Sequence, residues 1–168
     1  MPFLVLAILD QRYRLAFVLF VIAGVTDGLD GLAARLLRQQ TQLGEYLDPV
    51  ADKLLLSTLF LVLTHVGLIS WRVTVLVFGR DLGILVVSAI LYVALGMRDF
   101  RPSIYGKANT LAQILALIGV LLSLFFSPGW VLACRRYALD ATVILTVVSG
   151  FHYAWRVAHR LTAHTVAS

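Results

Sequence analysis

Four aspartates carry the clearest chemistry in this sequence. Asp27 and Asp30 are three residues apart, and Asp48 and Asp52 are four residues apart. Spacings of three and four place the side chains of each pair on one face of a helix. The stretch between the pairs, Leu36 to Leu47, is long enough to let two such helices run antiparallel. We therefore expect all four carboxylates to meet at the same end of a helix pair.

Such a cluster points to divalent metal ions. Four carboxylates cannot all stay ionised at close range in a medium of low dielectric constant unless cations lie among them. Carboxylate oxygens suit Mg²⁺ or Mn²⁺, and two such ions can hold the attacking and leaving oxygens of a phosphoryl transfer. Helix capping is the alternative, and Asp48 followed by Pro49 does resemble an N-cap and first-turn pair. Capping explains one aspartate but not four in register. We therefore predict a metal site, in which Asp48 can both bind metal and cap a helix.

Small residues and one arginine accompany the aspartates. Gly31, Ala34 and Gly44 would let a ligand or another backbone come close, although small residues also serve helix packing. Arg35 is a suitable partner for a phosphate, and the alternative is a basic side chain that reaches the membrane surface.

The composition indicates a membrane protein. Of the 168 residues, 60% are hydrophobic and 14% are charged, whereas a soluble domain has roughly a quarter charged residues. The formal charge of +5 comes from basic residues scattered between apolar runs, which favours membrane-flanking anchors over nucleic-acid binding. The single Cys134 excludes an intrachain disulfide, and the four histidines lack the spacing of a zinc site.

The apolar runs predict an all-α, polytopic membrane bundle of six helices in a single domain, residues 1–168. The first run is too short to cross a bilayer, so we interpret it as the remnant of a truncated first spanning helix, with a short interfacial helix as the alternative. Connections are expected at Leu36–Leu47, Gly96–Ser103 and Ser127–Tyr137. The predicted helices are Pro2–Leu9, Leu15–Ala34, Val50–Leu68, Val73–Leu95, Ala108–Phe126 and Leu139–Ala158.

The basic residues indicate an orientation. One side of the membrane would hold the connections Leu36–Leu47 and Gly96–Ser103 and the C-terminus. That side has seven basic residues and the other side has five, so we expect the side with seven to be cytoplasmic. The seven are Arg35, Arg38, Arg98, Arg101, Lys107, Arg156 and Arg160, and the five are Arg12, Arg14, Arg72, Arg135 and Arg136.

Further polar residues are candidates for binding a second substrate. Arg80 and Asp81 lie inside a predicted spanning helix, where ionisable groups are costly and often functional; the alternative is an ion pair that locks the bundle. Arg101, Lys107 and Asn109 could together receive an anionic headgroup, although Lys107 could equally be a cytoplasmic anchor.

The motif from Asp27 to Asp52 reads DGLDGLAARLLRQQTQLGEYLDPVAD. It matches every fixed position of D-x-x-D-G-x-x-A-R-x8-G-x-x-x-D-x-x-x-D, the signature of the CDP-alcohol phosphatidyltransferases. The chain resembles this family along nearly its whole length, because the six-helix plan also agrees.

The resemblance implies a reaction and roles for the residues. Members displace CMP from a CDP-linked lipid with the hydroxyl of an acceptor alcohol. Asp27, Asp30 and Asp48 would bind two metal ions with Asp52, which would also be the general base. The nucleotide pocket would be lined by Gly31, Ala34, Arg35 and Gly44. The family also implies a homodimer in a membrane, here expected to be the bacterial inner membrane, with CDP-diacylglycerol as donor.

Two stretches bear on the acceptor. The G-R-D at Gly79 to Asp81 and the S-I-Y-G-K-A-N-T at Ser103 to Thr110 look most like cardiolipin synthases that depend on CDP-diacylglycerol. Phosphatidylglycerophosphate synthases tend to have R-E in the first stretch and a second lysine in place of Asn109. We therefore expect phosphatidylglycerol as acceptor, with glycerol 3-phosphate as the alternative.

Two other classes of function fit the sequence less well. A metal-ion or proton transporter would place acids near the membrane midplane and on several helices, whereas these four lie at one end of two adjacent helices. A non-catalytic scaffold would not need an intact motif.

Overall fold

A computed structural model describes residues 2–36, 42–95 and 104–167, with side chains described for residues 2–29, 53–90 and 104–159. Within these ranges every element is a helix and there is no strand, so the all-α prediction is confirmed. The helices are α1 (Pro2–Leu9), α2 (Tyr13–Leu36), α3 (Gln42–His65), α4 (Trp71–Leu95), α5 (Ile104–Ser123) and α6 (Gly129–Ala167).

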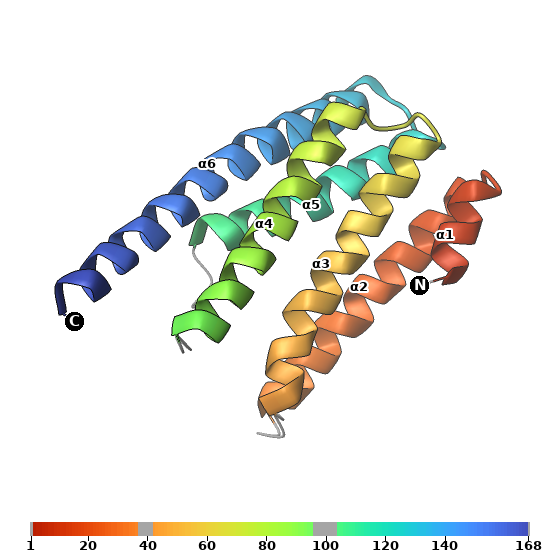
Figure 1. Cartoon of the computed structure of the whole chain (residues 1–168). Coiled ribbons are helices and arrows are strands. Elements are labelled where there is room, and N and C mark those ends of the chain that lie inside the picture. The colour runs from red at the N-terminus through yellow and green to blue at the C-terminus, as the bar shows by residue number, and fades with distance from the viewer. Residues whose placement is uncertain (1, 37–41, 96–103, 168) are drawn as a thin grey trace.

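The helices run up and down past one another (Figure 1). At one end of the bundle, which we call the aspartate end, α2, α4 and α6 finish and α3 and α5 begin. The short α1 packs on α2 and α3 at the opposite end, while α6 packs on α4 and α5. Helix α5 lies centrally, because it contacts α2, α3 and α6.

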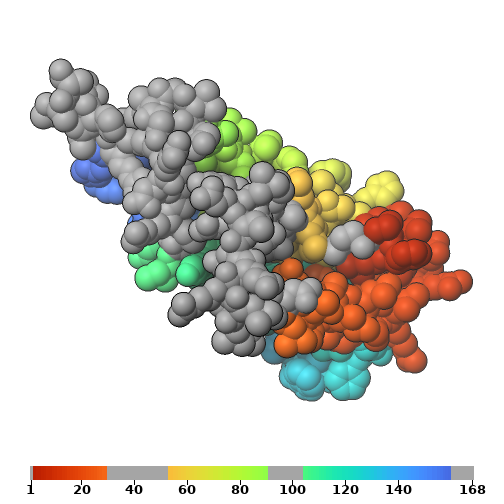
Figure 2. Space-filling model, turned by 90° about the horizontal axis from the view of Figure 1, so that it is seen from below, coloured from red at the N-terminus to blue at the C-terminus, as the bar shows by residue number. Residues whose placement is uncertain are grey.

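The hydrophobic core joins α1, α2, α3 and α5 near the end opposite the aspartates. Ile8, Phe60, Leu63 and Leu117 are all fully buried there. Burying such side chains stabilises the bundle by about 1.5–3 kcal/mol each if they would otherwise face water. The core therefore holds α2 and α3 through their shared contacts with α1 and α5, and described parts of both helices are visible from below the bundle (Figure 2, orange and yellow).

The turn after α3 is closed by a glycine. Gly67 has a positive φ of 77°, a conformation that costs glycine nothing. The Gly67 N–H donates to the carbonyl of Thr64, and the Leu68 N–H donates to the carbonyl of Leu63 at 2.8 Å. This pair of bonds is a Schellman motif, which satisfies the last carbonyls of the helix and reverses the chain.

Helix α3 begins earlier than its apolar residues predict. It starts at Gln42 rather than Val50, so the connection from α2 is shorter than the predicted Leu36–Leu47. The interpretation of Asp48 and Pro49 as a helix start is wrong, because both lie inside α3. A proline in a helix interior removes one backbone hydrogen bond, but the helix continues through it.

The prediction of a connection over Ser127–Tyr137 is also wrong over most of its length, since α6 begins at Gly129. The carbonyl of Pro128 accepts hydrogen bonds from the N–H groups of Val131 at 2.9 Å and Leu132 at 3.3 Å. Pro128 therefore acts as the residue that opens the helix, and Pro-Gly marks a helix start rather than an extended loop.

Large apolar side chains cover much of the described surface. On α4, Val75, Leu82, Val86 and Ile90 are all exposed and share one face. Among the described residues, two helices are long and apolar enough to cross a membrane, over Trp71–Ile90 and Ile104–Ser123. Contiguous apolar surface of this kind suits a lipid environment rather than water.

Arg135 ties three elements together at the end opposite the aspartates. Its guanidinium donates to the hydroxyl of Ser123 at 3.2 Å and to the carbonyl of Leu68 at 2.8 Å. Its backbone lies so close to α5 that a Cβ on Gly119 would stand 3.2 Å from the Cα of Arg135. Arg135 therefore anchors both the last turn of α5 and the turn after α3.

We predict that Arg135→Ala destabilises the fold by about 1.5–3 kcal/mol, because hydrogen bonds made by a charged group contribute that much. Thermal unfolding of the detergent-purified protein measures the effect. Arg136→Ala is the matched control, since the neighbouring arginine is exposed. Equal melting temperatures for the two variants would contradict the anchoring role.

Candidate active site

The backbone brings the predicted metal ligands to one end of the bundle. Asp27 and Asp30 lie in the last three turns of α2, and Asp48 and Asp52 lie in the first three turns of α3. Leu36 and Gln42, which bound the connection, are six residues apart in the sequence, so they are separated by at most about 20 Å. The antiparallel arrangement expected from the spacing is thus present.

Of the four aspartates, only Asp27 has a described side chain, and it is exposed. An exposed carboxylate is accessible to a hard divalent ion. The side chains of Asp30, Asp48 and Asp52 lie outside the described set. Within that set, no three His, Cys, Asp or Glu side chains could hold a metal ion together, so the four-aspartate cluster stays a prediction.

The residues predicted to line the nucleotide pocket lie near the aspartates in the fold. They lie on the same two helix segments as the aspartates, but their side chains are outside the described set. Gly31, Ala34 and Arg35 belong to the last two turns of α2, and Gly44 belongs to the first turn of α3.

A cluster of three charged residues lies beside this region. The carboxylate of Asp81 on α4 accepts hydrogen bonds from Lys53 of α3 at 3.1 Å and from Arg80 at 2.5 Å. The side chains of Asp81 and Arg80 are only 5% and 8% exposed, and that of Lys53 is 24% exposed. Because Lys53 directly follows Asp52, the ion pair joins α4 to the segment that carries the predicted base.

Two cations thus share one carboxylate, which leaves a formal charge of +2 − 1 = +1 on this trio. In a buried site this excess favours an anion nearby. The guanidinium has five N–H donors, and the bonds to Asp81 and Ser149 use two of them. The trio can therefore bind a phosphate or another carboxylate in addition to Asp81.

The polar contacts continue onto α6 and α5. The Nε of Arg80 donates to the hydroxyl of Ser149 at 2.9 Å, and that hydroxyl donates to the carbonyl of Thr146 at 3.3 Å. The hydroxyl of Thr146 in turn donates to the side-chain oxygen of Asn109 at 3.0 Å. A single chain of hydrogen bonds therefore crosses α3, α4, α6 and α5.

Two amide nitrogens in this interior have unused donors. The Nδ2 of Asn109 and the Nε2 of Gln113 are buried and make no hydrogen bond with any described residue. Asn109 and Gln113 are one turn apart on α5, so their side chains lie on the same face. An unsatisfied buried donor costs about 1–3 kcal/mol, which favours an acceptor such as water or a substrate oxygen at this position.

The acceptor candidates are only partly brought together. Arg80 and Asp81 pair with each other, as the bundle-locking alternative expects. Asn109 joins the same network through Thr146 and Ser149. Lys107 is exposed in the first turn of α5, and Arg101 lies outside the described residues.

Sequence reasoning missed the contribution of α6. Thr142, Thr146 and Ser149 are buried although they belong to a run of otherwise apolar residues. Tyr153 continues the series, and its hydroxyl shares a hydrogen bond of 2.7 Å with that of Ser88 on α4. The spacings of four, three and four were the available signal, because they place these polar groups on one helix face.

The chain belongs to the CDP-alcohol phosphatidyltransferase family, whose model matches residues 1–153. This match covers the whole aspartate motif and the network around Asp81. The resemblance inferred from the motif is thereby confirmed.

Three named relatives are similar to the chain over most of its length. A probable phosphatidylglycerophosphate synthase from Mycobacterium tuberculosis is 35% identical over 142 residues, which cover 84% of this chain and 65% of the relative. A cardiolipin synthase (CMP-forming) from Rattus norvegicus is 31% identical over 144 residues, or 75% of this chain and 47% of the relative. A CDP-diacylglycerol–glycerol-3-phosphate 3-phosphatidyltransferase from Aquifex aeolicus is 32% identical over 158 residues, or 90% of this chain and 85% of the relative.

We predict that Asp81→Asn destabilises the protein by about 3–5 kcal/mol, because it leaves a buried arginine without its anionic partner. Thermal unfolding in detergent measures the loss, and Asp140→Asn is the control because Asp140 is exposed on α6. The double variant Arg80→Met/Asp81→Leu should recover much of the stability, since apolar side chains of similar size often replace a buried pair without cost. An Asp81→Asn protein as stable as the wild type would rule out a structural role for the pair.

Proposed function

We propose that this protein transfers a phosphatidyl group from CDP-diacylglycerol to phosphatidylglycerol, forming cardiolipin and releasing CMP. The complete eight-position motif carries the proposal, because its two halves lie on the converging segments of α2 and α3. Membership in the CDP-alcohol phosphatidyltransferase family supports the reaction class.

The proposed step is a substitution at phosphorus. The acceptor hydroxyl oxygen forms a bond to the phosphorus of the phosphatidyl group while the anhydride bond to CMP breaks. The hydroxyl proton passes to the carboxylate of Asp52, and CMP leaves with the electron pair of the broken bond. A carboxylate within hydrogen-bond reach of the hydroxyl is a suitable general base.

The remaining aspartates would hold two divalent ions, Mg²⁺ or Mn²⁺. Asp27, Asp30 and Asp48 are the proposed ligands together with Asp52, and the bound ions would neutralise the diphosphate. Gly31, Ala34 and Gly44 would allow the nucleotide to approach the backbone, and Arg35 would pair with a phosphate oxygen.

The acceptor would bind on the side of α4 and α5. The excess positive charge of the Lys53, Asp81 and Arg80 trio suits the phosphate of phosphatidylglycerol, and the unused amide donor of Asn109 suits a headgroup oxygen. Arg101 and Lys107 would add positive charge at the start of α5. Glycerol 3-phosphate is the second candidate acceptor, because several relatives are named for it.

The setting we propose is a bacterial inner membrane crossed by a six-helix bundle, with the aspartate end facing the cytoplasm. The exposed apolar faces and the two apolar helices of spanning length support the membrane. Lys107 in the first turn of α5 and Arg156 in α6 support the orientation, because basic residues favour the cytoplasmic side. A homodimer is the proposed assembly, following the family.

We predict that the purified protein releases CMP from CDP-diacylglycerol in the presence of Mg²⁺ or Mn²⁺ and forms cardiolipin with phosphatidylglycerol. EDTA should abolish the reaction and added metal should restore it. Asp52→Asn should lower turnover by about a hundredfold or more, because general-base catalysis contributes roughly that factor, while binding of CDP-diacylglycerol persists.

Asp10→Asn is the control for this assay, since Asp10 is exposed near the opposite end of the bundle. Product formed only with glycerol 3-phosphate would replace the proposed acceptor by the second candidate. Absence of CMP release with every acceptor would refute the transferase proposal, and loss of donor binding in Asp52→Asn would make Asp52 chiefly a metal ligand.

A further inference from the structure

A depression of about 420 Å³ lies at the end of the bundle opposite the aspartates. It is lined by residues 11–15, which form the turn after α1 and the start of α2, and by residues 124–125, which follow α5. Its volume is in the range of sites that hold small molecules. The turn after α1 and the end of α5 both lie away from the aspartate end (Figure 1), so this depression is separate from the proposed active site.

The lining of the depression carries two positive charges and no negative one. Arg12 and Arg14 are both exposed, and Asp10, the nearest acidic residue in the sequence, is not part of the lining. In the described part of the chain both ion pairs are made by Asp81, so neither of these arginines is paired with a carboxylate. Unpaired guanidinium groups at one depression favour an anionic ligand, and their planar donor groups suit phosphate oxygens.

An apolar floor lies beneath the guanidinium of Arg14. The Cζ of Arg14 lies 6.0 Å from the centre of the Phe125 ring, which is a cation–π contact. The Phe125 ring in turn packs edge-on against Phe17, with 5.4 Å between the ring centres. Leu15 and Leu124 complete the apolar part of the lining. A site that combines cations with an apolar floor suits a lipid phosphodiester better than a free phosphate ion.

The turn beside the depression contains a backbone conformation that favours glycine. Gln11 has a φ of 58°, in the left-handed region that a side chain disfavours. Its N–H donates to the carbonyl of Ile8 at 3.0 Å, and the N–H of Arg12 donates to the carbonyl of Ala7 at 2.8 Å. This is the motif that Gly67 closes after α3. A glutamine in place of glycine strains the turn, and its side chain lines the depression; such strain is common at ligand sites.

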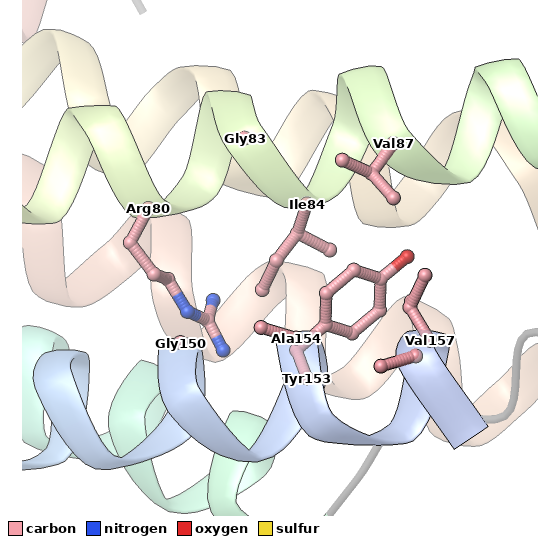
Figure 3. A pocket seen from close by; sticks show the side chains of 9 residues that line it. Arg80, Gly83, Ile84, Val87, Gly150, Tyr153, Ala154 and Val157 are labelled. Carbon is pink, nitrogen blue, oxygen red and sulfur yellow. The ribbon is translucent and has the colours of Figure 1, made fainter.

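The open space between α4 and α6 lacks these features (Figure 3). Two of its lining side chains have polar ends, and both make hydrogen bonds inside the bundle. The guanidinium of Arg80 donates to Ser149, and the hydroxyl of Tyr153 bonds to that of Ser88. The rest of that lining is apolar, so it offers no unpaired charge to select a ligand.

The depression lies at the level expected for lipid headgroups. Trp71 and Trp130 are exposed in the first turns of α4 and α6, at the same end of the bundle, and tryptophan is enriched at membrane–water interfaces. The ring of Trp130 packs edge-on against Phe126, the neighbour of Phe125. A phosphate at this level is that of a phospholipid in the adjacent leaflet.

We propose that Arg12 and Arg14, with the side-chain amide of Gln11, bind the phosphodiester of an anionic phospholipid at the end of the bundle opposite the aspartates. An anionic lipid is favoured over a zwitterionic one, because the ammonium group of a zwitterionic headgroup would lie close to two arginines and be repelled. This lipid is a bound ligand rather than a substrate, since the depression is at the other end of the bundle from the aspartates. The inference does not depend on the proposed transferase function.

Two double variants that remove the same charge form a matched pair. Arg12→Gln/Arg14→Gln removes the charge of the depression, whereas Arg72→Gln/Arg136→Gln removes two exposed arginines outside it. In neutral detergent, phosphatidylglycerol should raise the melting temperature of the wild type by about 3 °C or more above the value with phosphatidylcholine. This difference should vanish in the first variant and persist in the second.

Binding of phosphatidylglycerol at the proposed acceptor site does not affect this comparison, because neither variant changes that site. The lipid-free melting temperatures of the two variants should be equal, since all four arginines are exposed. An equal loss of the lipid effect in both variants, or no loss in either, would overturn the proposal.

Hydrogen exchange tests the location and the source of the phosphate. Phosphatidylglycerol should slow the exchange of the backbone amides of residues 11–16 in the wild-type protein, and inorganic phosphate at the same concentration should not. Equal slowing by inorganic phosphate would make this a site for the free ion and overturn the lipid. Slowing confined to other segments would overturn the location.

Gln11→Gly tests the strained turn. The variant should raise the melting temperature of the lipid-free protein by about 2–4 °C, because glycine adopts the left-handed conformation without strain. It should also reduce the effect of phosphatidylglycerol, because the side-chain amide is lost. An unchanged lipid effect would exclude Gln11 from the site. None of these measurements uses turnover, so their outcome is independent of the transferase proposal.

Discussion

The arrangement of α3, α4 and α6 depends on the hydrogen bonds that the carboxylate of Asp81 accepts. This carboxylate is nearly buried and receives both Lys53 and Arg80, and Arg80 then reaches Ser149. A charged group removed from water needs its partners at short range, so the three helices cannot shift independently. The same requirement holds α3, which carries Asp52, against α4. A buried ion pair thus connects the donor and acceptor sides of the proposed reaction.

Much of the fold follows from the sequence because the determining signals are local. Six apolar runs correspond to six helices in the described part of the chain, and the predicted end of the helix at Leu95 agrees with the end of α4. Asp27 and Asp30 lie on α2, and Asp48 and Asp52 lie on α3, toward one end of the bundle, but the meeting of their four carboxylates stays a prediction from helical periodicity. The helix boundaries are predicted less well where residues are polar: the sequence predicts connections over Gln42 to Leu47 and from Gly129, although both segments are helical.

The network around Asp81 could not be derived in this way. The sequence predicts the ion pair of Arg80 with Asp81 as one alternative. The hydrogen bond between Lys53 and Asp81, however, joins residues 28 positions apart, and the one between Arg80 and Ser149 joins residues 69 positions apart. Contacts of that range depend on how the helices pack, which hydrophobic periodicity does not encode. The open space lined by Gly83, Gly150 and Ala154 cannot be predicted from the sequence either, because it exists only when α4 and α6 lie side by side.

The close pairing of α5 with α6 has a consequence for how the chain enters a bilayer. Asn109 is buried against Thr146, and Gly119 lets the backbone of Arg135 approach within van der Waals contact. An isolated α5 would expose the side-chain oxygen of Asn109 to lipid without its hydrogen bond from Thr146, and unsatisfied polar groups in lipid are costly. In a bilayer the two helices would therefore be most stable as a hairpin, because α6 supplies the donor that the side-chain oxygen of Asn109 needs.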